Sequence, residues 1–283
     1  DAIAEQSQKL ITCPEIFHND KRAALLEKLL AITPPNLQHI FICNSGTESM
    51  EGAIKFARYS TGKPDFICTE GGFHGRSMGA LSATHKAHYR ENFEPLLPGF
   101  HHVPFNDFES LRNKANDKTG GIILELVQGE GGIRIGDREY IRKVREFCTE
   151  NGIVLIIDEV QTGFCRTGKM FAVDHYGIEP DILCLAKAIA GGFPMGAIVC
   201  SGSIKLTTGK HGSTNGGNPL ACSAAIAAID FMEQNKLAEK AAEKGEYILD
   251  ALKKQSFDPV IEIRGMGLMI GIELKGECKP YID

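Results

Sequence analysis

The 283-residue sequence lacks an excess of positive charge, an uninterrupted apolar stretch and paired cysteines. Lys and Arg number 31 against 36 Asp and Glu, and this net charge of −5 argues against a nucleic-acid partner. The most apolar long stretch, residues 182–200, is interrupted by Lys187, two glycines and Pro194, so we expect no membrane span. The nine cysteines form no C-x-x-C pair, which favours a soluble protein of the reducing cytoplasm.

Several motifs are also missing. There is no G-x-G-x-x-G after a strand and no G-x-x-x-x-G-K-[ST], which argues against a nicotinamide or P-loop enzyme. No charged and then apolar leader opens the chain, so we expect no secretory signal. The first residue is Asp rather than Met, so we expect a trimmed or partial chain.

What is present indicates an α/β protein of about two domains, or one large domain with a remnant of another. Short apolar runs alternate with helical periodicities between residues 39 and 200, the pattern of parallel strands joined by crossover helices. We predict strands at residues 39–43, 66–69, 121–125, 153–157, 182–185 and 197–200.

The helix signals are local. A capping box at 45–48 predicts a helix that ends near residue 62, and a second apolar stripe predicts a helix over 137–152. Asn218 and Pro219 open a long Ala-rich helix, followed by another that reaches Lys254. Two further strands are expected at 261–267 and 268–274.

Polar residues directly after apolar strands are the first candidates for a site, because ligands gather at the carboxyl ends of a parallel sheet. Asp158 follows one strand, and it would need a cationic partner there unless it is only a loop carboxylate. Lys187 follows another strand in apolar company, where burial would lower the pKa of its amine and make it an imine-forming nucleophile. A lysine that extends to the surface explains the same pattern.

Three glycine-containing turns add to these two residues. Residues 45–47 combine a hydroxyl with a helix start, which suits a phosphate, although a simple helix cap fits as well. Phe73 and Arg76 offer an aromatic face and a clamp for a carboxylate, or else a solvated surface loop. Glu130 lies in a tight turn that structural glycines explain nearly as well. A phosphate site, a stacking aromatic, a carboxylate and an imine-forming lysine are the needs of pyridoxal phosphate.

Six sequence strings occur in a fixed order along the chain. They are NSGTE at 44–48, FHGR at 73–76, QGEGG at 128–132, DEVQTG at 158–163, LAK at 185–187 and GSTNGGNP at 212–219. These strings resemble the class III (ornithine-type) aminotransferases, over residues 40 to 274 approximately. The resemblance implies a fold type I pyridoxal-phosphate-dependent transferase, α/β, with a mostly parallel central sheet flanked by helices. It divides the chain into a large cofactor domain at 1–232 and the start of a small C-terminal domain at 233–283, without the family's N-terminal segment and the rest of its C-terminal lobe.

The resemblance also assigns roles to residues. Lys187 would hold the cofactor covalently and carry the proton during transamination, and Asp158 would keep the pyridine nitrogen protonated. The remaining cofactor-binding residues would be Gly46 and Thr47 at the phosphate, Phe73 stacked on the ring, Glu159, Val160 and Gln161 in the stretch beside it, and Thr214 reaching the phosphate of a neighbouring subunit. Substrate would meet Arg76, Glu130 and Ser213. The active site would therefore need a homodimer, and no metal site is predicted.

Three positions depart from the family pattern. Leu126 replaces a usual Pro, Cys165 replaces a usual Gly, and Asn215 stands where an aromatic usually follows the threonine, which bears on the pocket. His74 after Phe73, together with Glu130, favours an acetylornithine-type enzyme.

The predicted function is therefore transfer of the terminal amino group of an N-acetylornithine-like donor to 2-oxoglutarate, giving a semialdehyde and glutamate in arginine or lysine biosynthesis. The alternatives are a 4-aminobutyrate or ornithine aminotransferase, an aminomutase, or a truncated cofactor-binding fragment without full activity.

Overall fold

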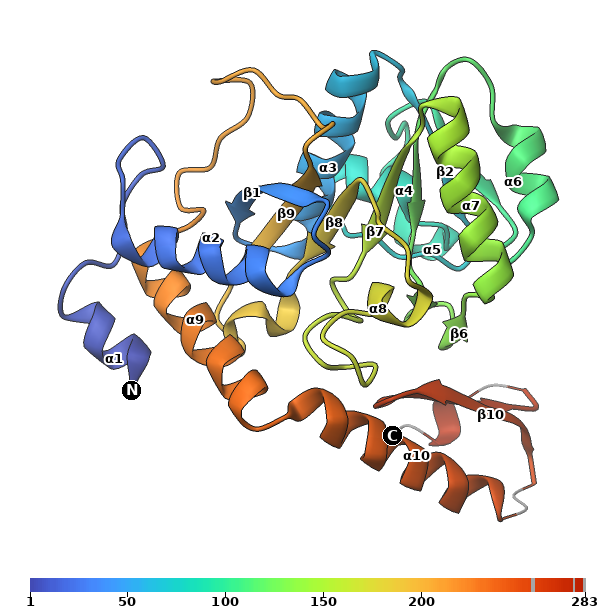
Figure 1. Ribbon diagram of the computed structural model, residues 1–283. Coiled ribbons are helices and arrows are strands. Elements are labelled where there is room, and N and C mark those ends of the chain that lie inside the picture. Colours follow the sequence, from blue (N-terminus) through green and yellow to red (C-terminus); the bar gives the residue numbers. More distant parts are fainter. Residues whose placement is uncertain (256–257, 277, 282–283) are drawn as a thin grey trace.

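The computed structural model describes residues 1–255, 258–276 and 278–281, so the small domain predicted at 233–283 lies partly outside the described residues. A seven-stranded sheet runs through the molecule in the order β1-β9-β8-β7-β4-β2-β3 (Figure 1). Its strands are β1 (Leu37–Cys43), β2 (Asp65–Thr69), β3 (Phe100–Val103), β4 (Thr119–Leu124), β7 (Val154–Asp158), β8 (Ile182–Leu185) and β9 (Gly196–Ser201). All six strands predicted between residues 39 and 200 are confirmed, and β3 is an additional edge strand.

The sheet is mostly parallel, as expected. The pairs β2·β3, β2·β4, β4·β7 and β7·β8 are parallel, whereas β9 runs antiparallel to both of its neighbours, β1 and β8. The prediction of one more parallel strand at 197–200 is therefore wrong. A parallel return needs a long crossover, whereas the connection between β8 and β9 contains only the 3-10 turn Lys187–Ala190.

Helices cover both faces of the sheet (Figure 1). Alternate strand residues point to opposite faces, so Ile123 belongs to the same apolar core as Met50 and Ala80, while its neighbour Ile122 belongs to the core on the other face with Val144 and Ile229. The helices are α1 (Ala2–Ser7), α2 (Asp20–Ile32), α3 (Gly46–Thr61), α4 (Met78–Ala83), α5 (Ala87–Arg90), α6 (Phe108–Lys114), α7 (Arg138–Asn151), α8 (Val173–Tyr176), α9 (Pro219–Gln234) and α10 (Leu237–Lys253). The apolar cores on both faces hold the sheet edge rigidly, which fixes the positions of the residues at the strand ends.

The chain leaves this body through α9 and α10 and continues into a hairpin, seen below the sheet in Figure 1. Strands β10 (Val260–Met266) and β11 (Met269–Leu274) form the antiparallel pair predicted there. The Arg264 guanidinium donates to the carbonyl of Gly132, at 2.7 Å, in the turn between β5 (Val127–Gln128) and β6 (Arg134–Ile135). This contact docks the hairpin against the large body.

None of the helices within the described ranges is long and apolar enough to cross a membrane.

Candidate functional site

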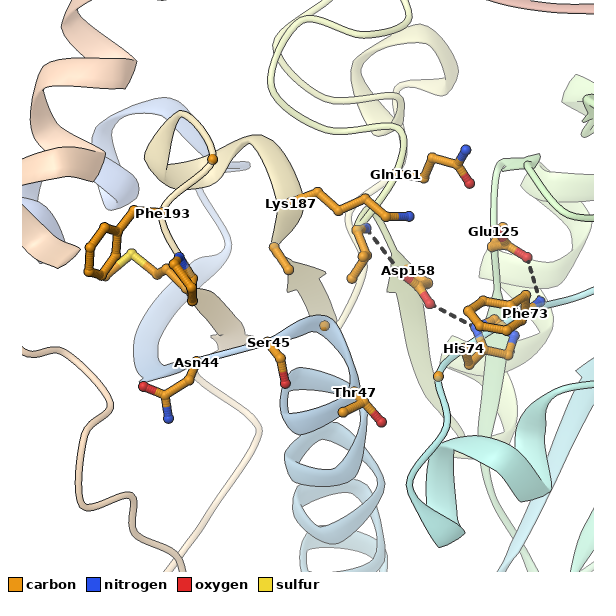
Figure 2. A pocket seen from close by; sticks show the side chains of 17 residues that line it. Asn44, Ser45, Thr47, Phe73, His74, Glu125, Asp158, Gln161, Lys187 and Phe193 are labelled. Atoms are coloured by element: carbon orange, nitrogen blue, oxygen red, sulfur yellow. Dashed lines mark hydrogen bonds and ion pairs between the residues drawn. The ribbon is translucent and has the colours of Figure 1, made fainter. Parts of the chain in front are cut away.

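A cavity of about 350 Å³ opens at the carboxyl ends of β7 and β8 (Figure 2). The start of α3, the loop after β2 and the turn after β8 complete its walls. This is the edge at which open parallel sheets bind ligands. Seven residues predicted as site residues line the cavity: Gly46, Thr47, Phe73, Asp158, Val160, Gln161 and Lys187. The structure thus brings four separate stretches of sequence into one site.

Asp158 is the last residue of β7, and its carboxylate is held from two sides. Its Oδ1 accepts the backbone N–H of Val160 at 3.0 Å, and its Oδ2 accepts Nδ1–H of His74 at 2.8 Å (Figure 2). His74 and Asp158 are both buried. Burial opposes protonation of His74, but the hydrogen bond and the charge of Asp158 outweigh it and raise the pKa of His74. The hydrogen-bond partner that holds the buried Asp158 carboxylate is therefore His74.

Glu125 is a second buried carboxyl group in the cavity wall. Its Oε2 accepts the backbone N–H of Phe73 at 3.0 Å, which fixes the loop that carries the aromatic ring. Burial raises the pKa of Glu125 to about 7, and the charge of His74 opposes that rise. Sequence reasoning used His74 only as a marker of the donor type and gave Glu125 no role. Their signals were a histidine next to the predicted stacking ring and a glutamate directly after the apolar run 121–124.

The first turn of α3 forms the polar end of the cavity. The Ser45 side chain accepts the N–H of Glu48, and the Glu48 carboxylate accepts the N–H of Asn44 at 2.9 Å, so a capping arrangement is present. A Cβ atom at Gly46 would lie 2.8 Å from Cγ1 of Val160, so only glycine lets the helix start approach the β7 loop this closely. The positive end of a long helix therefore faces a narrow part of the cavity.

Lys187 is the first residue of the turn after β8, with φ at 46° in the left-handed region. Its side chain is exposed and extends across the cavity towards Asp158 and Gln161 (Figure 2). Of the two interpretations that the sequence left open, the structure contradicts the buried amine. Its neighbours Leu185 and Ala186 are buried, but the chain turns out of the sheet at Lys187 and directs this side chain into the cavity.

Two predicted substrate residues, Arg76 and Glu130, are exposed and do not line the cavity. Tyr89 links them. The guanidinium carbon of Arg76 lies 4.3 Å from the centre of the Tyr89 ring, and the Tyr89 hydroxyl donates to Oε2 of Glu130 at 3.0 Å. Tyr89 also lies edge-on to Phe73, with ring centres 5.1 Å apart. The two charges are thus held together beside the aromatic wall of the cavity.

Ser213 and Thr214 also lie outside the cavity lining. The Ser213 hydroxyl accepts from the side-chain amide of Asn44 at 3.2 Å, which ties its loop to the start of α3. Thr214 is exposed on the surface of this single chain.

Glu159 is fully buried and is not among the lining residues, unlike its neighbours in the DEVQTG string. Its carboxylate accepts the hydroxyl of Thr162 and the backbone N–H of Val173, the latter at 2.7 Å. These bonds close the loop between β7 and α8. Burial raises the pKa of Glu159 to about 7, even though both hydrogen bonds act to lower it.

This raised pKa predicts that Glu159 destabilises the fold as pH rises from 4.5 to about 7. Within that window the folded protein keeps the proton that the unfolded chain releases, so the stabilisation present at low pH is lost as pH increases. Relative to a Glu159→Gln variant, we expect the wild-type free energy of unfolding to fall by roughly 2–3 kcal/mol between pH 5 and pH 8. Urea unfolding of both proteins at the two pH values measures this, and a difference independent of pH would contradict the prediction.

Taken together, the cavity offers four complementary groups. The start of α3 suits an anion, the Phe73 face suits a flat ring, Asp158 suits a protonated ring nitrogen, and the Lys187 amine can condense with a carbonyl. A heteroaromatic aldehyde that carries a phosphate matches all four groups.

Comparisons with known proteins agree with this chemistry. The profile of the aminotransferase class-III family matches residues 1–282. Acetylornithine aminotransferase of Methanosarcina acetivorans is 46% identical over 283 residues, which cover 100% of this chain and 71% of that protein. The [LysW]-aminoadipate semialdehyde transaminase of Deinococcus radiodurans is 45% identical, with coverages of 99% and 66%. Among solved structures, ornithine aminotransferase of Toxoplasma gondii superimposes with a TM-score of 0.92 at 31% identity, with coverages of 97% and 68%.

Proposed function

The chain belongs to the class III aminotransferases, which depend on pyridoxal phosphate, and from this premise we propose that it moves the terminal amino group of an N-acetylornithine-like donor to 2-oxoglutarate. The observation that carries the choice of donor is the degree of similarity. Relatives named acetylornithine aminotransferase are 43–47% identical, whereas the ornithine aminotransferase of Toxoplasma gondii is 31% identical. The products would be a semialdehyde and glutamate.

The residues present fit the cofactor. Gly46 and Thr47 would hold the phosphate at the start of α3, in the space that the missing Cβ of Gly46 leaves beside Val160. Phe73 would lie against the ring and Asp158 against its nitrogen. When bound, pyridoxal phosphate supplies an electron-accepting ring for the charge left when the C–H bond of the donor breaks.

Each of these chain residues has a distinct task. Lys187 would anchor the cofactor through its ε-amine and then, once released by the incoming donor, take and return the proton at the reacting carbon. Exposure of Lys187 within the cavity fits this double role, because the amine has space to move. Asp158, held by His74, would keep a negative charge against the ring nitrogen. Gln161 and Val160 would border the ring.

Arg76 and Glu130 would select the substrates. Arg76 would bind a carboxylate of the donor or of 2-oxoglutarate. Glu130 would adjust the charge at the entrance when one substrate replaces the other, and Tyr89 contacts both side chains. Ser213 would complete the substrate end from the loop beside Asn44.

The proposed enzyme is a cytoplasmic homodimer with an active site shared between subunits. Thr214 is exposed, as expected of a residue that reaches the phosphate of a partner. Residues 1–232 would form the large cofactor domain, and 233–283 would begin the small one. The hairpin of β10 and β11, docked on the turn that contains Glu130, supports this division.

A donor panel tests the proposal. The cofactor-loaded protein is mixed with N-acetylornithine, ornithine or 4-aminobutyrate, and the loss of the cofactor's visible absorption is followed without a keto acid. We expect N-acetylornithine to react fastest, by roughly tenfold or more, because ornithine would bring a free, charged α-amine and 4-aminobutyrate would lack the acetamido group altogether. Faster reaction with ornithine or 4-aminobutyrate would overturn the donor assignment.

A second candidate donor is an aminoadipate-derived amine, because the Deinococcus radiodurans relative is nearly as similar as the acetylornithine enzymes. An α-blocked lysine in the same panel separates the two, since it is longer by one methylene. Absence of any half-reaction, with cofactor bound, would instead support a binding fragment without full activity.

A further inference from the structure

A chain of three polar side chains lies directly behind the proposed phosphate site. The Thr47 hydroxyl, at the start of α3, is 2.5 Å from the hydroxyl of Ser77, and the Ser77 hydroxyl is 2.6 Å from Oε1 of Glu51. Thr47 lines the cavity, whereas Ser77 and Glu51 do not. The chain therefore leads from the cavity to a carboxylate on the next turn of the same helix.

The number of protons in this series of hydrogen bonds fixes the direction of each bond. Two oxygen atoms 2.5–2.6 Å apart need a proton between them. The chain has two such gaps and two hydroxyl protons, because an ionised carboxylate has none to give. Ser77 donates to Glu51, so Thr47 must donate to Ser77. The backbone N–H of Ser77 in turn donates to Oγ1 of Thr47, at 3.2 Å. Thr47 thus presents a lone pair, and no proton, to the cavity.

Glu51 is firmly fixed as the acceptor at the end of this chain. Its Oε1 also accepts the backbone N–H groups of Gly79 and Ala80 in α4, at 2.7 and 3.1 Å. A Cβ atom at Gly79 would lie 2.4 Å from Oε2 of Glu51, so α4 and the carboxylate are in close contact. The carboxylate would keep these two donors if the Ser77 proton were withdrawn.

We propose that Glu51 and Ser77 withhold the hydroxyl proton of Thr47 from the phosphate site, and that a bound phosphate obtains this proton by reversing the direction of the chain. In the reversed state Thr47 donates to phosphate, Ser77 donates to Thr47, and Glu51 keeps the N–H groups of α4. Ser77 and Glu51 are positioning residues that limit phosphate affinity. This inference rests on the proposed cofactor site.

Substitution of Ser77 tests the direction of this chain. Ser77→Ala removes the competing acceptor, so the Thr47 proton is available to phosphate from the outset. We expect pyridoxal phosphate to bind roughly two- to tenfold more tightly, the range of one ordinary hydrogen bond, while pyridoxal, which lacks the phosphate, binds unchanged. The measurement is the dissociation constant of each compound, by absorbance titration. The ratio of the pyridoxal constant to the pyridoxal phosphate constant should therefore rise, and it cancels every contribution of the ring and of Lys187.

Matched variants make the result decisive. In a Thr47→Val background, Ser77→Ala should no longer change the ratio, because the proton in question is gone. Glu51→Gln, whose amide oxygen can still accept from α4, should shift the ratio in the same direction as Ser77→Ala. It gives a second route if the serine variant folds poorly.

Two results would overturn the inference: a ratio of the pyridoxal constant to the pyridoxal phosphate constant that is unchanged or lower in Ser77→Ala, or a shift of that ratio that persists in the Thr47→Val background. If the wild-type protein binds pyridoxal phosphate no better than pyridoxal, the cavity does not hold a phosphate site. That outcome is distinguishable, because it contradicts the proposed function before any variant is compared.

Discussion

Replacement of Lys187 by alanine is expected to lower the rate of transamination by about 10⁴-fold or more. Under the proposed function, the variant loses both the amine that would condense with the cofactor and the base that would move the proton. Within the described cavity lining, Lys187 is the only lysine, so no neighbouring amine can replace it. The measurement is kcat with N-acetylornithine and 2-oxoglutarate, under saturating cofactor.

Lys169→Ala is the matched control. Lys169 is exposed in the loop between β7 and α8 and does not line the cavity, so its loss should leave kcat within a factor of about two. Borohydride treatment of the wild-type protein, followed by peptide mapping, should place the reduced cofactor on Lys187. Full turnover by Lys187→Ala, or a label on another lysine, would contradict the assignment.

The strands at the centre of the sheet were predictable because they are buried on both faces. Residues 154–157 and 182–185 are continuous apolar runs, and such runs indicate strands of a parallel sheet. The edge strand β3 was not predicted. Its residues Phe100–Val103 include two histidines and are mostly half-buried, so the apolar pattern is interrupted. Periodicity along a strand carries no information about which way it runs, so only the short connection after residue 185 indicated the direction of β9.

Asp158 and Lys187 were predictable as a pair because each directly follows an apolar run, and the ends of adjacent parallel strands meet at one edge. The exposure of Lys187 was one of two interpretations that the sequence left open. Apolar neighbours along the chain indicate burial only while the strand continues, and the chain turns at Lys187 with a positive φ. His74 and Glu125 act on residues far away in the sequence, separated from Asp158 by 84 positions in the case of His74, and only the fold brings them together.

The link between Arg76 and Glu130 was hidden for the same reason. Tyr89 lies in α5, a short helix with no strong periodicity, and nothing in its local sequence indicates a contact with either charge. The sequence motifs therefore identified seven of the residues that line the cavity, whereas the residues that hold them in place required coordinates.

Asp158 gives the second large expected effect, because its charge is held in place by two donors and cannot be replaced by water. Asp158→Asn preserves size and one acceptor but removes the negative charge, and His74 then loses the hydrogen bond and charge that raise its pKa. We expect kcat to fall roughly 10²- to 10³-fold, as for loss of other electrostatic groups in closed sites. Cofactor should still bind, because the phosphate site and Lys187 remain.

Asp117→Asn, an exposed aspartate in the turn before β4, controls for the amide substitution and should retain full activity. A cofactor analogue can then show whether Asp158→Asn loses activity because the negative charge is gone or because the site is disturbed in general. If Asp158 acts by keeping the ring nitrogen charged, a cofactor analogue methylated at that nitrogen carries the charge permanently and should restore part of the rate in Asp158→Ala, where the smaller side chain leaves space for the methyl group. Equal activity of that variant with either cofactor would show that Asp158 orients the ring rather than charging it, since only a charging role depends on the protonation state of the nitrogen.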